Sequence, residues 1–190
     1  RVGDTYNTAI GQYGFQITPI QAVRAIAAIA NKGTLLTPTI ISEKTRHEVM
    51  QKHDINEDEK KLILATGQEK IGITNPGYYK VVQEGMRLAV TEETMKGLDL
   101  PYVKVAGKTG TAQLGISKKF INSWSVGFFP YDNPKYTFAV VLEKGPPTYK
   151  VSAMRVMGSV LSWVNIYRPE YFGKAPRGAE EPVEEEEKGE

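Results

Sequence analysis

The sequence predicts an α/β fold of the α+β type, in which an antiparallel sheet carries helices on its faces. Three apolar runs, beginning near residues 102, 123 and 136, have the alternation or β-branched composition of strands. Short polar turns join them, among them Pro130-Tyr131-Asp132-Asn133-Pro134. Strands linked in this way favour an antiparallel meander, and segments with helical spacing precede and follow it.

The first predicted helix begins at Thr18-Pro19, where threonine suits the cap and proline the first turn. Its apolar side chains recur every three or four residues, at Ile20, Val23, Ile26, Ala27 and Ala30. Asn31-Lys32-Gly33 ends it. Before it, Gly11-Gln12-Tyr13-Gly14 is typical of a flexible turn, and after it residues 34–41 suit an edge strand or an extended segment around Pro38.

Residues 42–74 are rich in charge and are interpreted as an excursion from the core, with a short helix at residues 57–64. They contain both histidines, His47 and His53. Their six-residue separation fits neither helical i, i+4 spacing nor a zinc-finger pattern, so solvated surface is favoured over a metal site.

A second helix is predicted from Asn75-Pro76 to about Val90, with one face directed at the sheet. The residues of this face, which recur at helical spacing, are Tyr79, Val82, Met86 and Ala89. A polar connection over residues 91–101 then leads to the first strand.

Residues 102–113 combine a strand pattern with candidate site residues. Val103 and Val105 alternate with Lys104, and the alternation stops where Gly107 and Gly110 enclose Lys108-Thr109. Backbone without side-chain bulk can lie close to a ligand, although glycine in a strand can also mark only a bulge or bend. The tripeptide Lys-Thr-Gly is expected at the end of this strand. Its role in a functional site is therefore a hypothesis that needs structural context.

The next two strands and a long helix complete the predicted core. Trp124, Val126 and Phe128 are expected on one face of the second strand, and Ser125 and Gly127 on the other. The third strand is apolar over residues 138–142, as expected where both faces are covered. The final helix ends at Arg168-Pro169 after one broad apolar stripe, and Trp163 is interpreted as core. The stripe comprises Ala153, Val156, Met157, Val160, Leu161 and Val164.

Composition is that of a globular chain, with 41% hydrophobic and 24% charged residues among 190. The chain has no cysteine, which excludes thiol catalysis, disulfides and cysteine-ligated metals. No apolar run approaches the roughly 20 residues that span a bilayer. Residues 180–190 hold seven Glu and one Lys, leaving 23 basic and 15 acidic residues and a net charge of +8 before them. The cations are scattered, which disfavours nucleic acid as a partner.

Several motifs together resemble the class B penicillin-binding proteins, of the elongation (PBP2) type. They span most of residues 3–145: Gly3-Asp4-Thr5, Ala9-Ile10-Gly11-Gln12, Thr18-Pro19-Ile20-Gln21, Ala30-Asn31-Lys32-Gly33-Thr34, Val105-Ala106-Gly107-Lys108-Thr109-Gly110-Thr111-Ala112-Gln113 and Trp124-Ser125-Val126-Gly127-Phe128-Phe129-Pro130. Lys-Thr-Gly belongs to the signature set of this superfamily, with Ser-x-x-Lys and Ser-x-Asn-type motifs. The resemblance implies part of the penicillin-binding/serine β-lactamase-like transpeptidase fold.

The resemblance also implies an activity, D,D-transpeptidation of peptidoglycan. A serine attacks the penultimate D-Ala carbonyl of a stem peptide, terminal D-Ala leaves, and the acyl group passes to an amine of a neighbouring strand; β-lactams acylate the same serine. Lys108, Thr109 and Gly110 correspond to the cradle for the substrate carboxylate, and the backbone N–H of Thr111 to an oxyanion donor. Lys108, Thr109 and Thr111 are thus the catalytic candidates, and no cofactor or metal is implied.

The chain departs from the family pattern in lacking a fitting Ser-x-x-Lys and any Ser-x-Asn before Lys108. Both motifs lie upstream of Gly3-Asp4-Thr5 in the family. We therefore expect residues 1–173 to be the C-terminal part of a transpeptidase domain, inactive alone, and residues 174–190 an acidic disordered tail. Where members often have Gly-Gln-Gly, this chain has Tyr13 after Gln12.

The resemblance further implies a periplasmic domain held at the bacterial inner membrane by an N-terminal anchor outside this chain. Implied partners are the stem peptide, β-lactams, the N-terminal half of the same protein, and a cell-elongation scaffold and glycosyltransferase. Two alternatives remain open: a β-lactamase or β-lactam sensor of the same fold, and a non-catalytic module that holds a partner or the wall polymer.

Overall fold

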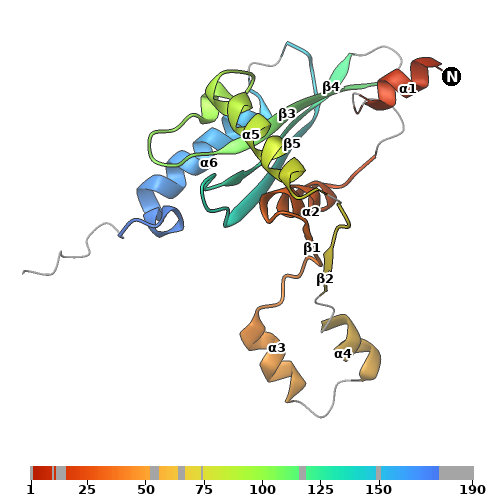
Figure 1. The fold of residues 1–190 in the computed structure, drawn as a ribbon, viewed down its shortest axis with the longest axis vertical. Coiled ribbons are helices and arrows are strands. Elements are labelled where there is room, and N and C mark those ends of the chain that lie inside the picture. Colours follow the sequence, from red (N-terminus) through yellow and green to blue (C-terminus); the bar gives the residue numbers. More distant parts are fainter. Residues whose placement is uncertain are drawn as a thin grey trace, which may run out of the picture.

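The centre of the molecule is a three-stranded antiparallel sheet in the order β3-β4-β5. The computed structural model describes residues 2–9, 11, 16–51, 56–63, 67–73, 75–115, 119–148 and 151–175. The sheet strands are β3 (Ala106–Leu114), β4 (Phe120–Phe129) and β5 (Tyr136–Gly145). Helices α2 (Pro19–Ala30) and α5 (Gly77–Thr91) lie on one face, and α6 (Ala153–Tyr167) lies on the other (Figure 1). The predicted meander and its helical layers are confirmed.

Alternation along β4 divides the core between the two faces. Phe128 packs with Ala106 of β3 and with helices α2 and α5, whereas its neighbour Phe129 joins a second cluster that includes Met157 and Leu161 of α6. Trp124 and Val126 share the face of Phe128, and Ser125 shares that of Phe129, because side chains alternate along a strand. The predicted assignment of β4 residues to two faces is confirmed.

Helix α2 starts and ends at the predicted signals. Thr18 and Gln21 form a reciprocal capping box, in which each side chain accepts a hydrogen bond from the other's backbone N–H. After the helix the Asn31 side chain bonds both backbone groups of Thr34, donating to its carbonyl and accepting from its N–H. Ile20, at the start of the helix, is 53% exposed, and the buried residues of α2 are Ala22, Ala28 and Ala30.

Helix α5 faces the sheet with a slightly different set of residues from the predicted one. Tyr79, Met86 and Ala89 are buried as expected, but Val82 is 45% exposed. The next residue, Gln83, occupies the α2–α5 interface, where its amide nitrogen donates to the carbonyls of Ile29 (2.7 Å) and Ala30 (3.2 Å). A polar side chain takes this place because the C-terminal carbonyls of α2 need hydrogen-bond donors.

Residues 42–74 form the predicted excursion. Strands β1 (Thr34–Leu36) and β2 (Gln68–Lys70) pair antiparallel and lead to α3 (Glu43–Met50) and α4 (Glu57–Ile63), which project away from the sheet (Figure 1). Helix α4 was predicted, but α3 was missed because it buries no residue and so lacks an apolar stripe. His47 is exposed on α3, and His53 lies outside the described residues.

Further elements of the structure were not predicted from the sequence. Helix α1 (Val2–Ala9) and the 3₁₀ turns η1 (Lys96–Leu98) and η2 (Pro169–Phe172) were all missed. On α6 the stripe is confirmed at Ala153, Met157 and Leu161. Trp163 is 54% exposed and makes a tilted ring contact with Tyr167, so its interpretation as core is wrong. Residues 12–15 and 176–190, which include most of the predicted turn and tail, lie outside the described part. Within the described residues, no helix is long and apolar enough to cross a membrane.

Candidate active site

Strand β3 carries all four predicted site residues, Lys108, Thr109, Gly110 and Thr111. The expectation that the strand starts near residue 102 and ends at Lys-Thr-Gly is wrong, since β3 runs from Ala106 to Leu114 and these residues lie in its middle. Val103 and Val105 are buried as their alternation indicated, but they belong to the approach to the strand. Among the described residues β3 pairs with β4 alone, and no described strand pairs with its other edge.

Gly107 does not interrupt the strand, because the packing around it leaves no room for a side chain. Gly107 lies opposite Gly127 of β4. A Cβ atom at Gly107 would lie 2.9 Å from Met95 Cε and 2.6 Å from the Val126 carbonyl oxygen. A Cβ atom at Gly127 would lie 2.7 Å from the Phe138 ring. Close packing at the Gly107–Gly127 pair therefore fixes the position of β3 at the residue that precedes Lys108.

The side chains of Lys108 and Thr109 belong to opposite faces of the sheet, as neighbours on a strand must. Lys108 lies opposite Val126, on the α2 side, and its ammonium group donates to the carbonyl oxygen of Thr109 at 2.9 Å. Thr109 lies opposite Ser125, on the α6 side, and its hydroxyl donates to that of Thr94 at 3.1 Å. The side chains of Lys108 and Thr109 are therefore both held at β3 by specific hydrogen bonds.

A cleft of about 770 Å³ lies along β3 between the sheet and the start of α2. All four predicted site residues line it, together with Ala112, Gln113 and Leu114 of β3. Its other walls are Gly11, Gln16, Ile17, Ala22, Ala25, Ile26, Gly115, Asn122, Trp124, Val126 and Glu143. This volume is sufficient for a small ligand or a short peptide. No serine is present among these described lining residues.

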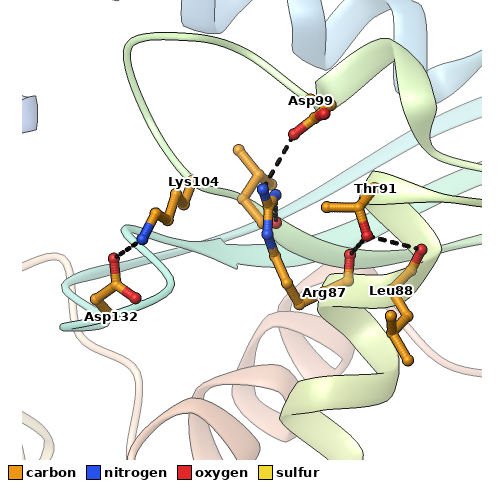
Figure 2. Close-up of polar contacts among 7 residues, drawn as sticks. Arg87, Leu88, Thr91, Asp99, Lys104 and Asp132 are labelled. Atoms are coloured by element: carbon orange, nitrogen blue, oxygen red, sulfur yellow. Dashed lines mark hydrogen bonds and ion pairs between the residues drawn. The ribbon is translucent and has the colours of Figure 1, made fainter.

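Polar contacts of Arg87 and Lys104 fix the segment that leads into β3 (Figure 2). Arg87 of α5, with 20% of its side chain exposed, donates to the Val105 carbonyl oxygen at 2.9 Å and to Asp99 at 3.0 Å. Lys104 forms an ion pair of 2.8 Å with Asp132 in the β4–β5 turn. The buried contact to Val105 is the stronger restraint, because the Lys104 pair is exposed to solvent.

Three polar residues near the site were not predicted. Asn122 and Glu143 line the far end of the cleft, and Thr94 hydrogen-bonds Thr109 from the connection after α5. Asn122 lies in β4, which begins at Phe120. No local pattern indicates any of the three, because strand pairing and the path of the connection bring them to β3.

Comparison with known proteins identifies the family. The model of the penicillin-binding protein transpeptidase domain matches residues 2–161. The chain belongs to this family. It is 28% identical over 156 residues to the peptidoglycan D,D-transpeptidase MrdA of Acinetobacter baumannii, covering 75% of this chain and 22% of that protein. It is 29% identical over 174 residues to stage V sporulation protein D of Bacillus subtilis, covering 85% of this chain and 25% of the relative.

Solved transpeptidase structures share the fold of this family member. PBP2 of Pseudomonas aeruginosa, solved in complex with WCK 5153, matches with a TM-score of 0.62 and 26% identity over 86% of this chain and 34% of that one. Penicillin-binding protein A of M. tuberculosis, solved as an imipenem acyl-enzyme, matches with a TM-score of 0.59 and 25% identity over 82% of this chain and 32% of that one. The class B resemblance and the penicillin-binding fold predicted from the sequence are confirmed. The chain spans about a quarter of the length of the two curated relatives above.

Proposed function

We propose that this chain forms one wall of a peptidoglycan D,D-transpeptidase site and binds the C-terminal carboxylate of a stem peptide. The observation that carries the proposal is that Lys108, Thr109, Gly110 and Thr111 line a cleft along a sheet edge with which no described strand pairs. An extended peptide can add to such an edge through backbone hydrogen bonds. The cation and hydroxyl groups at its centre suit a carboxylate.

Each residue of this wall has a distinct role in the proposal. The Lys108 ammonium group attracts the substrate carboxylate, and the Thr109 hydroxyl donates a hydrogen bond to it. The backbone N–H of Thr111 stabilises the oxyanion that forms when the D-Ala carbonyl is attacked. Gly110 has no side chain, so it adds no atoms to this approach.

The nucleophile in this proposal is a serine outside residues 1–190. Two observations support this: the sequence has no fitting Ser-x-x-Lys, and the described cleft walls include no serine. The relatives are about four times longer than the matched region, so they have room for such a segment. The N-terminal part of the same domain would then be a partner of this chain, and the chain alone would be inactive.

The remaining partners and the location follow from the family. The proposal places the domain on the periplasmic side of the inner membrane, with an anchor outside these residues, and includes β-lactams as ligands and a cell-elongation scaffold and glycosyltransferase as partners. The name of the Acinetobacter baumannii relative, a peptidoglycan D,D-transpeptidase, favours a transpeptidase over a β-lactamase or sensor. Sustained turnover of a β-lactam by the complete domain would reverse that preference.

A fluorescent penicillin tests the proposal. We expect no covalent labelling of residues 1–190 alone, and labelling at an upstream serine when the chain is joined to the upstream part of a transpeptidase domain. Mass spectrometry of the labelled peptide locates the modified residue. Labelling of the 190-residue chain itself would refute the assignment of the nucleophile, and an unlabelled complete domain would refute transpeptidase chemistry.

A further inference from the structure

Thr94 provides the hydrogen-bond partner of the Thr109 hydroxyl. The two hydroxyl oxygens lie 3.1 Å apart, with Thr109 donating. Thr94 is outside β3, in the connection between α5 and η1, and is 15 residues away in sequence. It also lies outside the family motifs recognised in the sequence. The contact therefore joins a loop residue to the centre of the candidate carboxylate site.

The position of Thr94 is fixed by its neighbour Met95. Met95 is fully buried, and its N–H donates to the Ala89 carbonyl at 2.8 Å. Its Cε and Sδ atoms would lie 2.9 Å and 3.1 Å from a Cβ atom at Gly107, two residues before Thr109 on the same face of β3. Because β3 and the connection interlock at Met95 and Gly107, the Thr94 hydroxyl is held in register with Thr109.

A threonine hydroxyl has one proton to donate and can accept at its oxygen. Without a ligand, the Thr109 proton is directed to Thr94. To bind a carboxylate, Thr109 must redirect that proton to the ligand, and its oxygen then loses its contact with Thr94 unless Thr94 donates in return. Thr94 carries a rotatable proton that can do so. A hydroxyl that accepts a hydrogen bond is also a better donor, because linked hydrogen bonds polarise one another.

We propose that Thr94 is a positioning residue, whose hydroxyl donates to Thr109 when Thr109 donates to the substrate carboxylate. The pair then keeps its hydrogen bond with and without ligand, and only the direction of the bond reverses. This inference rests on the proposed function, since it assigns Thr94 a role at the same site. Thr94 itself does not contact the substrate.

The test uses residues 1–190 joined to the upstream part of the transpeptidase domain, and measures the second-order rate of acylation by benzylpenicillin. Thr94→Val should lower this rate about three- to tenfold, as expected for one neutral hydrogen bond. Thr94→Ser, which retains the hydroxyl, should remain within about twofold of the unchanged protein. Thr91→Val is the matched control, because among the described residues the Thr91 hydroxyl bonds α5 carbonyls alone, those of Arg87 and Leu88 (Figure 2). The acylation rate of this variant should not change.

Two further measurements separate positioning from a structural role. With the methyl ester of benzylpenicillin, which lacks the carboxylate, Thr94→Val should react at the same rate as the unchanged protein. In the Thr109→Val background, Thr94→Val should cause no additional loss, because the shared bond is already absent. An equal loss with acid and ester, or additive losses in the double variant, would overturn the inference while leaving the proposed function intact. Failure of the unchanged protein to be acylated would instead refute the proposed function and with it this inference.

Discussion

The Arg87 contact with the start of β3 makes the most specific prediction about stability. We expect Arg87→Met to lower the free energy of unfolding by about 2–4 kcal/mol. The hydrogen bond from the charged guanidinium to the Val105 carbonyl contributes about 1.5–3 kcal/mol, and the Asp99 pair contributes about 0.2–1 kcal/mol. Methionine preserves most of the apolar length of the side chain, so the loss reports mainly on the polar contacts.

Urea unfolding followed by circular dichroism measures this change, provided that the slope of the transition is the same in both proteins. Asp99→Asn is the matched control. Half of the Asp99 side chain is exposed, at 49%, and the substitution leaves the Val105 contact in place. It should therefore cost less than about 1 kcal/mol. A loss below about 1 kcal/mol for Arg87→Met, or equal losses for the two variants, would refute the view that the Val105 contact restrains β3.

The other predictions concern packing and titration. Gly127→Ala should destabilise the protein by about 1–3 kcal/mol in the same urea assay, because the new methyl group would lie 2.4 Å from the Ala106 carbonyl oxygen. Gly85→Ala, on α5 with open space around it, should instead stabilise the protein by about 0.5–1 kcal/mol. An unchanged free energy of unfolding in Gly127→Ala would contradict the packing described at β3. The hydrogen bond from Arg168 lowers the pKa of the Glu170 carboxyl, so NMR titration should find its midpoint below that of an unfolded glutamate. This contact stabilises the folded protein above the unfolded pKa and is lost as the pH falls through the folded pKa. Arg168→Gln should raise the midpoint, and no rise would exclude Arg168 as the cause.

The sequence predicted the elements whose patterns arise from burial. The meander, α2, α5 and α6 all have apolar residues with the period of their own secondary structure, and each buries the corresponding face. Helix α3 shows the limit of this signal. It projects from the core, buries nothing, and so has no apolar stripe to detect.

Errors at single residues have a related cause, because periodicity does not specify which neighbour an element meets. Val82 fits the apolar spacing of α5, yet Gln83 faces α2, where carbonyl groups need donors. Trp163 fits the apolar composition of α6 but is 54% exposed. Composition alone cannot separate a core aromatic residue from one on the outer side of a helix.

The candidate site was predicted in its central residues and missed at its periphery. Lys108 to Thr111 are contiguous, so a motif could identify them. Thr94 and Glu143 reach the same strand only through the fold, from the connection after α5 and from β5. The C-terminal end of β3 was placed too early because Gly107 and Gly110 suggest a break, whereas Gly107 makes room for Met95 within a continuous strand.

The acylation rate of a Lys108→Ala variant tests most directly whether this strand is the wall of a transpeptidase site. The protein is residues 1–190 joined to the upstream part of the domain, and the probe is a fluorescent penicillin. Loss of the charged contact to the carboxylate should slow acylation about 10- to 100-fold. Lys104→Ala is the control, because Lys104 lies on the same segment in an exposed ion pair with Asp132, and its rate should stay within about twofold. An unchanged rate in Lys108→Ala would contradict the account and favour a non-catalytic binding module.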